Sequence, residues 1–486
     1  MNRREFCKLA AAGAAGGLVL PEGMVSAEAT LSPQMVSHAD PLPPGSGELQ
    51  PKVRVHPGWR GLVSGLNNPF IPFGAMYFRA NDGWTPRFWE KFDARAARKD
   101  LRTLKGMNFN TVRLWLTSLS FYSHPGKLNP PAIEKFDQFL EAAEEVGIYV
   151  QVCGLTTWQG RPPDEVPPWQ RGDEYVDPAA VEDQVQFWHL MASRYKGRSV
   201  ILTYELANEP SIGWNTPAMQ IAWNKWNHRS MVIPPAKDNP GDSALLAYQH
   251  FREHVADEWT RRQVEAIKQA DPDALVTIGL IQWSIPAIPN PTYFYSGFRP
   301  QRQAKLLDFM EIHFYPLAAG TYTYQSEAIK VANLAYLESV VREVAKPGLP
   351  TMLAEFGWYG GGSCAGVGGG VIVPTQQQQA DFCAQEVRAA TPLVCGWLNW
   401  AMYDDPVAKD ITRFSGLFTA NGREKAWGRR FSQIARQYQR DLPPVPLGQI
   451  GPRPDLPWDD CLTSSAAAEK FRLDYLAAFE REEFRS

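Results

Sequence analysis

Residues 200–210 read VILTYELANEP, an apolar run that ends in an amide, a carboxyl and a proline. The β-branched and aromatic side chains at its start favour a buried strand over residues 200–206. Pro210 has no backbone N–H to donate, so it prevents the strand from continuing. We therefore expect Asn208 and Glu209 to stand side by side where this strand ends.

Similar apolar strands recur along the chain, in alternation with amphipathic helices. In one unit, Ile133, Phe136 and Leu140 recur at helical spacing. Gly147 then ends the helix, and a strand follows. Eight strands are predicted in this way, at residues 71–77, 109–116, 148–153, 200–206, 275–280, 308–314, 350–355 and 394–400. Because no glycine-rich dinucleotide fingerprint follows the first strand, the α/β alternation favours a closed (β/α)8 TIM barrel over an open doubly wound sheet.

A second carboxyl follows the seventh predicted strand. Residues 351–354 lead directly into Glu355, and the sequence FGW and a glycine-rich stretch come next. Active sites of such barrels lie at the carboxyl ends of the strands, so Glu209 and Glu355 are predicted to face each other at the barrel mouth. Retaining hydrolysis of a glycosidic bond needs two carboxyl groups about 5–5.5 Å apart, one to attack and one to protonate the leaving oxygen.

Four motifs resemble those of clan A glycoside hydrolases, most closely glycoside hydrolase family 5. They are NTVRLW (110–115), YELANEP (204–210), EIHFYP (311–316) and AEFGW (354–358). They fall on the second, fourth, sixth and seventh predicted strands, in the layout of the family. The resemblance covers about residues 71–440 and implies a retaining glycoside hydrolase that cleaves β-glycosidic bonds in a polysaccharide or oligosaccharide.

The resemblance also implies roles for individual residues. Glu209 would be the acid/base and Glu355 the nucleophile. Asn208 would hydrogen-bond the 2-hydroxyl of the bound sugar. Arg113 matches the family's second-strand arginine beside the nucleophile. His313 and Tyr315 match its sixth-strand pair, in which the tyrosine usually contacts the nucleophile. Trp400 matches the eighth-strand sugar platform.

Electrostatics assigns the two carboxyls the same tasks, because neighbouring carboxyl groups do not both ionise freely. Arg113 and Tyr315 favour an ionised Glu355. Glu209 has no predicted cationic partner and is repelled by Glu355, so we expect it to keep its proton and act as the general acid. Since the expected task of Arg113 is to hold a carboxylate and not to fill the core, Arg113→Ala is predicted to lower turnover with little unfolding.

The third predicted strand departs from the family pattern. It ends in VCGLTTW (152–158), where family 5 members often have a histidine, and this argues against simple cellulase specificity. The LTTWQG run (155–160) and ELANEP resemble endo-β-mannanases, which favours β-1,4-mannan as the substrate of an endo-1,4-β-mannosidase. The alternatives are another clan A specificity, such as a β-glucanase or an exo-β-glycosidase, and a non-catalytic carbohydrate-binding barrel. Trp158 and Trp358 are further candidates for sugar binding.

The bulk composition fits a neutral sugar as the partner. Lys+Arg 49 against Asp+Glu 52 gives a formal net charge of −3, which offers no basic face for nucleic acid. The 17 Trp and 17 Tyr residues supply flat amphipathic rings for a sugar-binding cleft. Neither a metal nor an organic cofactor is expected, because the sequence has no closely spaced zinc-binding cysteines and no His-x-His at the first strand.

The first residues resemble a twin-arginine export signal. Arg3-Arg4, an Ala/Gly-rich stretch and the small-residue site VSA predict a signal peptide over residues 1–27 and a periplasmic or extracellular protein. The apolar stretch, about a dozen residues long, is too short for a membrane span. The other predicted boundaries are a flexible leader (28–52), the catalytic barrel (53–440), and a Pro-rich linker with a C-terminal helix (441–486).

Removal of the signal leaves an odd number of cysteines, so at least one thiol is expected to stay free or to pair between chains. They are Cys153, Cys364, Cys383, Cys395 and Cys461.

Overall fold

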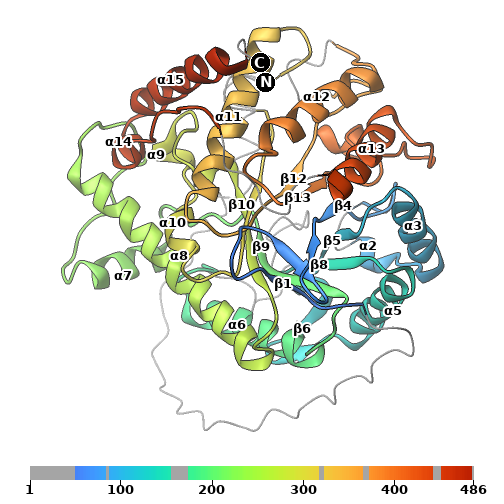
Figure 1. Cartoon of the computed structure of the whole chain (residues 1–486). Helices are drawn as coiled ribbons and strands as arrows, with labels where there is room; N and C mark the ends of the chain where they lie inside the picture. The colour runs from blue at the N-terminus through green and yellow to red at the C-terminus, as the bar shows by residue number, and fades with distance from the viewer. Residues whose placement is uncertain are drawn as a thin grey trace.

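A computed structural model of the chain describes residues 50–83, 87–154, 173–316, 322–364, 372–441 and 450–483. Eight parallel strands close into a barrel in the order β10-β11-β12-β13-β4-β5-β8-β9. They are β4 (Phe73–Met76), β5 (Thr111–Trp115), β8 (Tyr149–Cys153), β9 (Ile201–Asn208), β10 (Val276–Ile281), β11 (Met310–His313), β12 (Thr351–Phe356) and β13 (Gly396–Asn399). Each predicted strand is present, so the TIM-barrel prediction is confirmed (Figure 1). The predicted signal peptide, Trp158 and most of the predicted leader lie outside the described residues.

Helices connect the barrel strands and form the outer wall of the molecule (Figure 1). Capping residues determine where these helices begin and end. Asp93 accepts hydrogen bonds from the first backbone N–H groups of one helix, and Gly147, with φ 74°, closes another in the left-handed conformation. The wall helices are α2 (Arg87–Glu90), α3 (Ala94–Gly106), α5 (Pro130–Val146), α6 (Pro178–Arg194), α7 (Pro217–Trp226), α8 (Ser243–Ala270), α11 (Glu327–Ala345), α12 (Gln376–Ala390) and α13 (Ala426–Asp441).

Short elements occupy the loops between these helices and the strands. Helix α4 (Ser118–Phe121) and a small hairpin, β6 (Tyr122–His124) with β7 (Lys127–Leu128), follow β5. The turn η4 (Ile411–Arg413) follows β13. These elements extend the carboxyl end of the barrel.

The connection from β10 to β11 has no long helix in the wall. It contains η3 (Gln282–Ser284) and two single-turn helices, α9 (Pro291–Phe294) and α10 (Pro300–Gln303). Helices α14 (Trp458–Thr463) and α15 (Ser465–Glu483), from the end of the chain, lie on this side of the barrel, beside α9 and α11 (Figure 1). The predicted C-terminal helix is therefore part of the wall.

A small antiparallel sheet closes the amino-terminal end of the barrel. Its strands are β1 (Val53–Val55), β2 (Leu62–Ser64) and β3 (Asn68–Phe70), adjacent in that order. Val53, Leu62 and Phe70 pack against side chains near the amino ends of the barrel strands, such as Tyr149 and Met352. Because this apolar cluster seals one end of the barrel, the opposite, carboxyl end is the place for a site.

The barrel interior contains a polar layer beneath that carboxyl end. Arg113, Gln151, Glu205 and Glu311 each have 0% of their surface exposed. Buried charges persist in proteins only when they are paired and hydrogen-bonded, so this layer must satisfy itself internally.

The five described cysteines are all buried, and none of them forms a disulfide within the chain. Among the described residues, no helix has both the length and the apolar character that crossing a membrane requires.

Candidate active site

The two predicted catalytic carboxyls meet at the carboxyl end of the barrel. Glu209 directly follows β9 in the left-handed conformation (φ 51°), and its backbone N–H donates to the carbonyl of Gly279 at 2.8 Å. Glu355 lies near the end of β12. One oxygen from each carboxyl and a ring nitrogen of His313 lie within 4.8 Å of one another. This spacing suits retaining hydrolysis, since inverting enzymes hold the carboxyls about 6.5–9.5 Å apart to leave room for water.

Arg113 connects the nucleophile candidate to the barrel interior. Its Nη1 donates to Glu355 Oε2 at 2.7 Å. Its Nε and Nη2 donate to the two oxygens of Glu205 at 2.7 and 2.6 Å, and Nη2 also donates to Asn208 Oδ1 at 2.7 Å. Nη2 also donates to Cys153 Sγ at 3.6 Å, so the guanidinium has four hydrogen-bond partners, and its bidentate ion pair is with Glu205 and not with Glu355.

Tyr315 and His313 contact the two carboxyls from β11 and the loop that follows it. Tyr315 donates its hydroxyl proton to Glu355 Oε1 at 2.7 Å. The loop is fixed by Gln282, which accepts from the Tyr315 backbone N–H at 2.6 Å and donates to its carbonyl at 3.0 Å. His313 is fully buried, and its Nδ1 lies 3.2 Å from Glu209 Oε1 and 3.6 Å from Glu355 Oε2. The histidine therefore lies between the two carboxyls, within hydrogen-bond distance of Glu209.

The predicted tryptophan platforms differ in position. Trp400 follows β13, and its ring lies 5.3 Å from that of Trp115, which in turn lies 5.7 Å from the guanidinium carbon of Arg113. Trp358 is 2% exposed, and its Nε1 donates to the Tyr322 carbonyl at 2.8 Å. Trp400 is buried to the same degree, at 3% exposure, so burial does not distinguish the two tryptophans, and both remain predicted sugar-binding residues.

Burial controls the protonation of the three groups at the mouth. It raises the pKa of Glu209 to about 7, with Arg113 acting to lower it and Glu205 to raise it further. Burial also raises the pKa of Glu355 above the ordinary carboxyl value, and the neighbouring Glu209 raises it further, although His313, Arg113 and Tyr315 act to lower it. Burial lowers the pKa of His313 to about 4, so the imidazole is neutral near neutral pH. Glu209 is thus suited to hold a proton.

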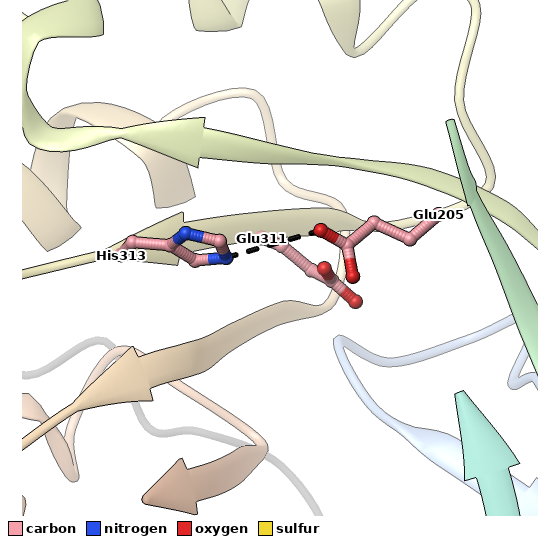
Figure 2. Close-up of side chains that lie close together, drawn as sticks. All are labelled: Glu205, Glu311 and His313. Carbon is pink, nitrogen blue, oxygen red and sulfur yellow. Dashed lines mark ion pairs between the residues drawn. The ribbon is translucent and has the colours of Figure 1, made fainter. Parts of the chain in front are cut away.

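Two buried carboxyls beneath the mouth were missed by the sequence analysis. Figure 2 shows Glu205 facing Glu311 and His313, with His313 Nε2 4.0 Å from Glu205 Oε1. Gln151 Nε2 donates to Glu205 at 2.8 Å and to Glu311 at 3.0 Å. A signal was present, because both glutamates interrupt apolar strands, and Glu311 alternates with His313 so that both point to one face.

Of these two glutamates, Glu205 is ionised and Glu311 is neutral. Burial acts to raise the pKa of Glu205, but the ion pair with Arg113 outweighs it and holds that pKa below its ordinary value. Burial raises the pKa of Glu311 well above its ordinary value, so this side chain is neutral. Glu205, Glu311 and His313 are close enough to hold a cation, within 4.8 Å. Since both oxygens of Glu205 already accept from Arg113, the guanidinium supplies the positive charge of this cluster.

A family model described as Cellulase (glycosyl hydrolase family 5) matches residues 73–405. This range contains all eight strands of the barrel and both carboxyls at its mouth. No curated protein sequence matches the chain.

Solved structures share the fold. A GH5_18 protein from Streptomyces cattleya, in complex with GlcNAc, has a TM-score of 0.60 and 20% identity, over 87% of this chain and 93% of that chain. A variant of the Streptomyces cattleya GH5_18, in complex with Manβ1-4GlcNAc, has a TM-score of 0.59 and 21% identity, over 84% and 97%. An exo-β-1,4-mannosidase from Opitutaceae bacterium strain TAV5 has a TM-score of 0.57 and 19% identity, over 79% of this chain and 62% of that protein. At these identities the likeness shows the barrel fold.

Proposed function

The chain belongs to glycosyl hydrolase family 5 and hydrolyses β-glycosidic bonds with retention, and on this premise we propose which residues carry the reaction. Glu355 attacks the anomeric carbon, while Glu209 protonates the leaving oxygen and then activates the water that releases the sugar. One observation carries the proposal: the two carboxyls meet within 4.8 Å beside a neutral histidine.

The contacts of Glu355 fit a nucleophile. Arg113 donates to one of its oxygens and Tyr315 to the other, each at 2.7 Å, and both contacts favour the ionised form. When Glu355 becomes an ester in the covalent intermediate, its negative charge disappears. Glu209 then loses a repelling neighbour and ionises more readily, which suits its second task as a base.

Asn208 is oriented to recognise the sugar. Its Oδ1 accepts from Arg113 Nη2 at 2.7 Å, so the amide oxygen is turned toward the guanidinium. The amide nitrogen is then available to donate to a hydroxyl next to the anomeric carbon. Such a contact strengthens as charge develops on the ring in the transition state.

The variants Glu355→Ala and Glu209→Ala test these roles on an aryl β-glycoside with an acidic leaving group. Glu355→Ala should lose several orders of magnitude in activity, because no covalent intermediate can form. Glu209→Ala should form the intermediate and release it slowly, since the leaving group needs little protonation but the second step lacks its base. Added azide should restore turnover of Glu209→Ala and give the β-glycosyl azide, identified by NMR. If the wild type releases the inverted sugar, or both variants keep near-native rates, the assignment fails.

We further propose a β-mannoside as the substrate, cleaved at its terminal mannose. The ELANEP motif and the LTTWQG run support mannose, as do two structural neighbours, an exo-β-1,4-mannosidase and a GH5_18 protein in complex with Manβ1-4GlcNAc. The first of these neighbours is named as exo-acting, which supports terminal over internal cleavage.

Products from mannohexaose distinguish the two modes of cleavage. Terminal attack should release mannose from the start, with mannopentaose as the other early product. Internal attack should instead give mannobiose to mannotetraose first, as the endo-1,4-β-mannosidase indicated by the sequence would. A faster rate on cellohexaose than on mannohexaose would contradict the choice of mannose.

Export through a twin-arginine-type signal is also part of the proposal, supported by Arg3-Arg4 and the cleavage site before Glu28. The first residue of the mature protein, sequenced from the native host, should lie near Glu28. A cytoplasmic protein that retains Met1 would refute it.

A further inference from the structure

We infer that Glu205, which the proposed reaction does not use directly, is a positioning residue: it fixes the guanidinium of Arg113, and its negative charge keeps the proton on Glu209. The inference rests on the proposed function, since it assigns Glu205 a task only if Glu209 is the acid. Glu205 acts through Arg113 and through space, and it is fully buried beneath the mouth.

The hydrogen bonds of Arg113 hold its guanidinium in one orientation. Glu205 accepts from Nε and Nη2 at 2.7 and 2.6 Å, a bidentate pair that fixes both the plane and the rotation of the guanidinium. With that plane fixed, Nη1 points at Glu355, 2.7 Å away. Without this bidentate pair, Arg113 would be held only by single hydrogen bonds, which leave the guanidinium free to rotate.

Glu205 is itself rigidly placed. Gln151 donates to its Oε2 at 2.8 Å, from the neighbouring strand β8. On the other side is Gly279 in β10, where any Cβ atom would lie 2.2 Å from Glu205 Oε1. The absence of a side chain at this position makes the space that the carboxylate occupies.

Charged groups around Glu209 influence whether it keeps its proton. The groups that face it are Arg113 from β5, Glu205 from β9, His313 and Tyr315 from β11 and its loop, and Glu355 from β12. Burial holds the imidazole and the phenol in their neutral forms. The only fixed positive charge in this set is therefore that of Arg113, and it acts to pull the proton from Glu209. Glu205 balances that charge.

The variant Glu205→Gln removes the charge and keeps the shape. Loss of a negative neighbour favours the ionised form of Glu209, so its pKa should fall and the acid form should disappear at lower pH. The basic limb of the kcat/KM profile should move down by roughly 1 pH unit. From an acid that is half-protonated near pH 7, that shift alone predicts about a five-fold loss at pH 7.

Glu311→Gln is the matched control. Glu311 is also fully buried, hydrogen-bonds the same Gln151, and is already neutral, so the substitution changes no charge. Its basic limb should stay in the wild-type position even if thermal unfolding shows that stability falls. An equal movement of the limb in both variants, or none in Glu205→Gln, would overturn the inference.

A second variant covers the case in which Glu205→Gln does not fold. Glu205→Asp keeps the charge but withdraws the carboxylate from Arg113, so the basic limb should remain in place while kcat falls at least ten-fold. An unchanged kcat, or a limb at lower pH, would refute the positioning role. The azide experiment on Glu209 and Glu355 uses the native Glu205. It therefore fails or succeeds independently, and separates an error in the proposed function from an error in this inference.

Discussion

Glu209 determines the pH dependence that we expect at the scale of single residues. Because burial raises its pKa to about 7, the general acid is lost as the pH rises through that value. On a glycoside with a poor leaving group, kcat/KM should therefore decline above about pH 7. The acid limb belongs to Glu355 and should lie above the ordinary carboxyl range, since burial raises that pKa too.

Two substrates allow this assignment to be checked. A glycoside with an acidic leaving group needs little protonation, so its basic limb should be weaker or displaced to higher pH. Profiles of kcat/KM measured on both substrates decide the point. An identical basic limb on the two substrates would mean that a group other than Glu209 controls it.

Arg113→Ala should destabilise the protein as well as inactivate it, which revises the expectation from sequence. The arginine is fully buried and holds two carboxylates, and not one exposed carboxylate at the rim. Removing one member of a buried ion pair costs about 3–5 kcal/mol, because the partner charge is left uncompensated. The thermal unfolding temperature and kcat should therefore both fall. A stable but inactive Arg113→Ala variant would instead favour the first expectation.

At the scale of elements, strand β10 leaves room for the site because one of its residues, Gly279, has no side chain. A Cβ atom at Gly279 would lie 2.2 Å from Glu205 Oε1 and 2.9 Å from a ring carbon of His313. Gly279→Ala should displace both groups and lower kcat by at least ten-fold, with an overpacking cost of about 1–3 kcal/mol. Activity and thermal unfolding measure the two effects.

Gly106→Ala is the control for that substitution. Gly106 is the last residue of α3, and a Cβ atom there would meet nothing within 4 Å. The activity of the Gly106→Ala variant should match that of the wild type. If Gly279→Ala behaved in the same way, the close packing of β10 against the carboxylate layer would not matter for catalysis.

At the scale of the whole molecule, the end of the chain completes the barrel wall where β10 connects to β11 without a long helix. Arg453 donates to Glu338 of α11 at 2.6 Å, and Tyr475 of α15 donates to the same carboxylate at 3.0 Å. Both side chains of the ion pair are nearly buried, at 3% and 6% exposure. These contacts join α15 to the catalytic barrel.

Glu338→Ala should lower the free energy of unfolding by about 3–5 kcal/mol, since it removes the carboxylate of a buried ion pair that Arg453 and Tyr475 both contact. The shape of the pH–activity profile should not change, because the pair is remote from the mouth. Lys470→Ala provides the comparison on α15: its ion pair with Asp474 is exposed, and such pairs contribute about 0–1 kcal/mol. Equal losses in the two variants would show that the C-terminal segment is not docked as described.

The sequence by itself determined the barrel and the two residues placed at its mouth. Strands such as 200–206 and 350–355 are apolar and end in Pro or in a Gly-containing loop, and these are local properties that act within a few residues. Parallel strands in a closed barrel all end on the same side, so the sequence predicts Glu209 and Glu355 at the same end of the barrel, although it does not give the distance between them.

Only the tertiary structure decided which groups hold those carboxyls. Arg113 lies 92 positions from Glu205 and 242 from Glu355 along the chain, and its choice of the bidentate partner depends on the register between strands. Trp358 and Trp400 both follow strands as sugar platforms would, and packing buries both of them. Burial and long-range pairing are properties of the assembled barrel, because each depends on atoms that distant strands bring together, and no local pattern contains them.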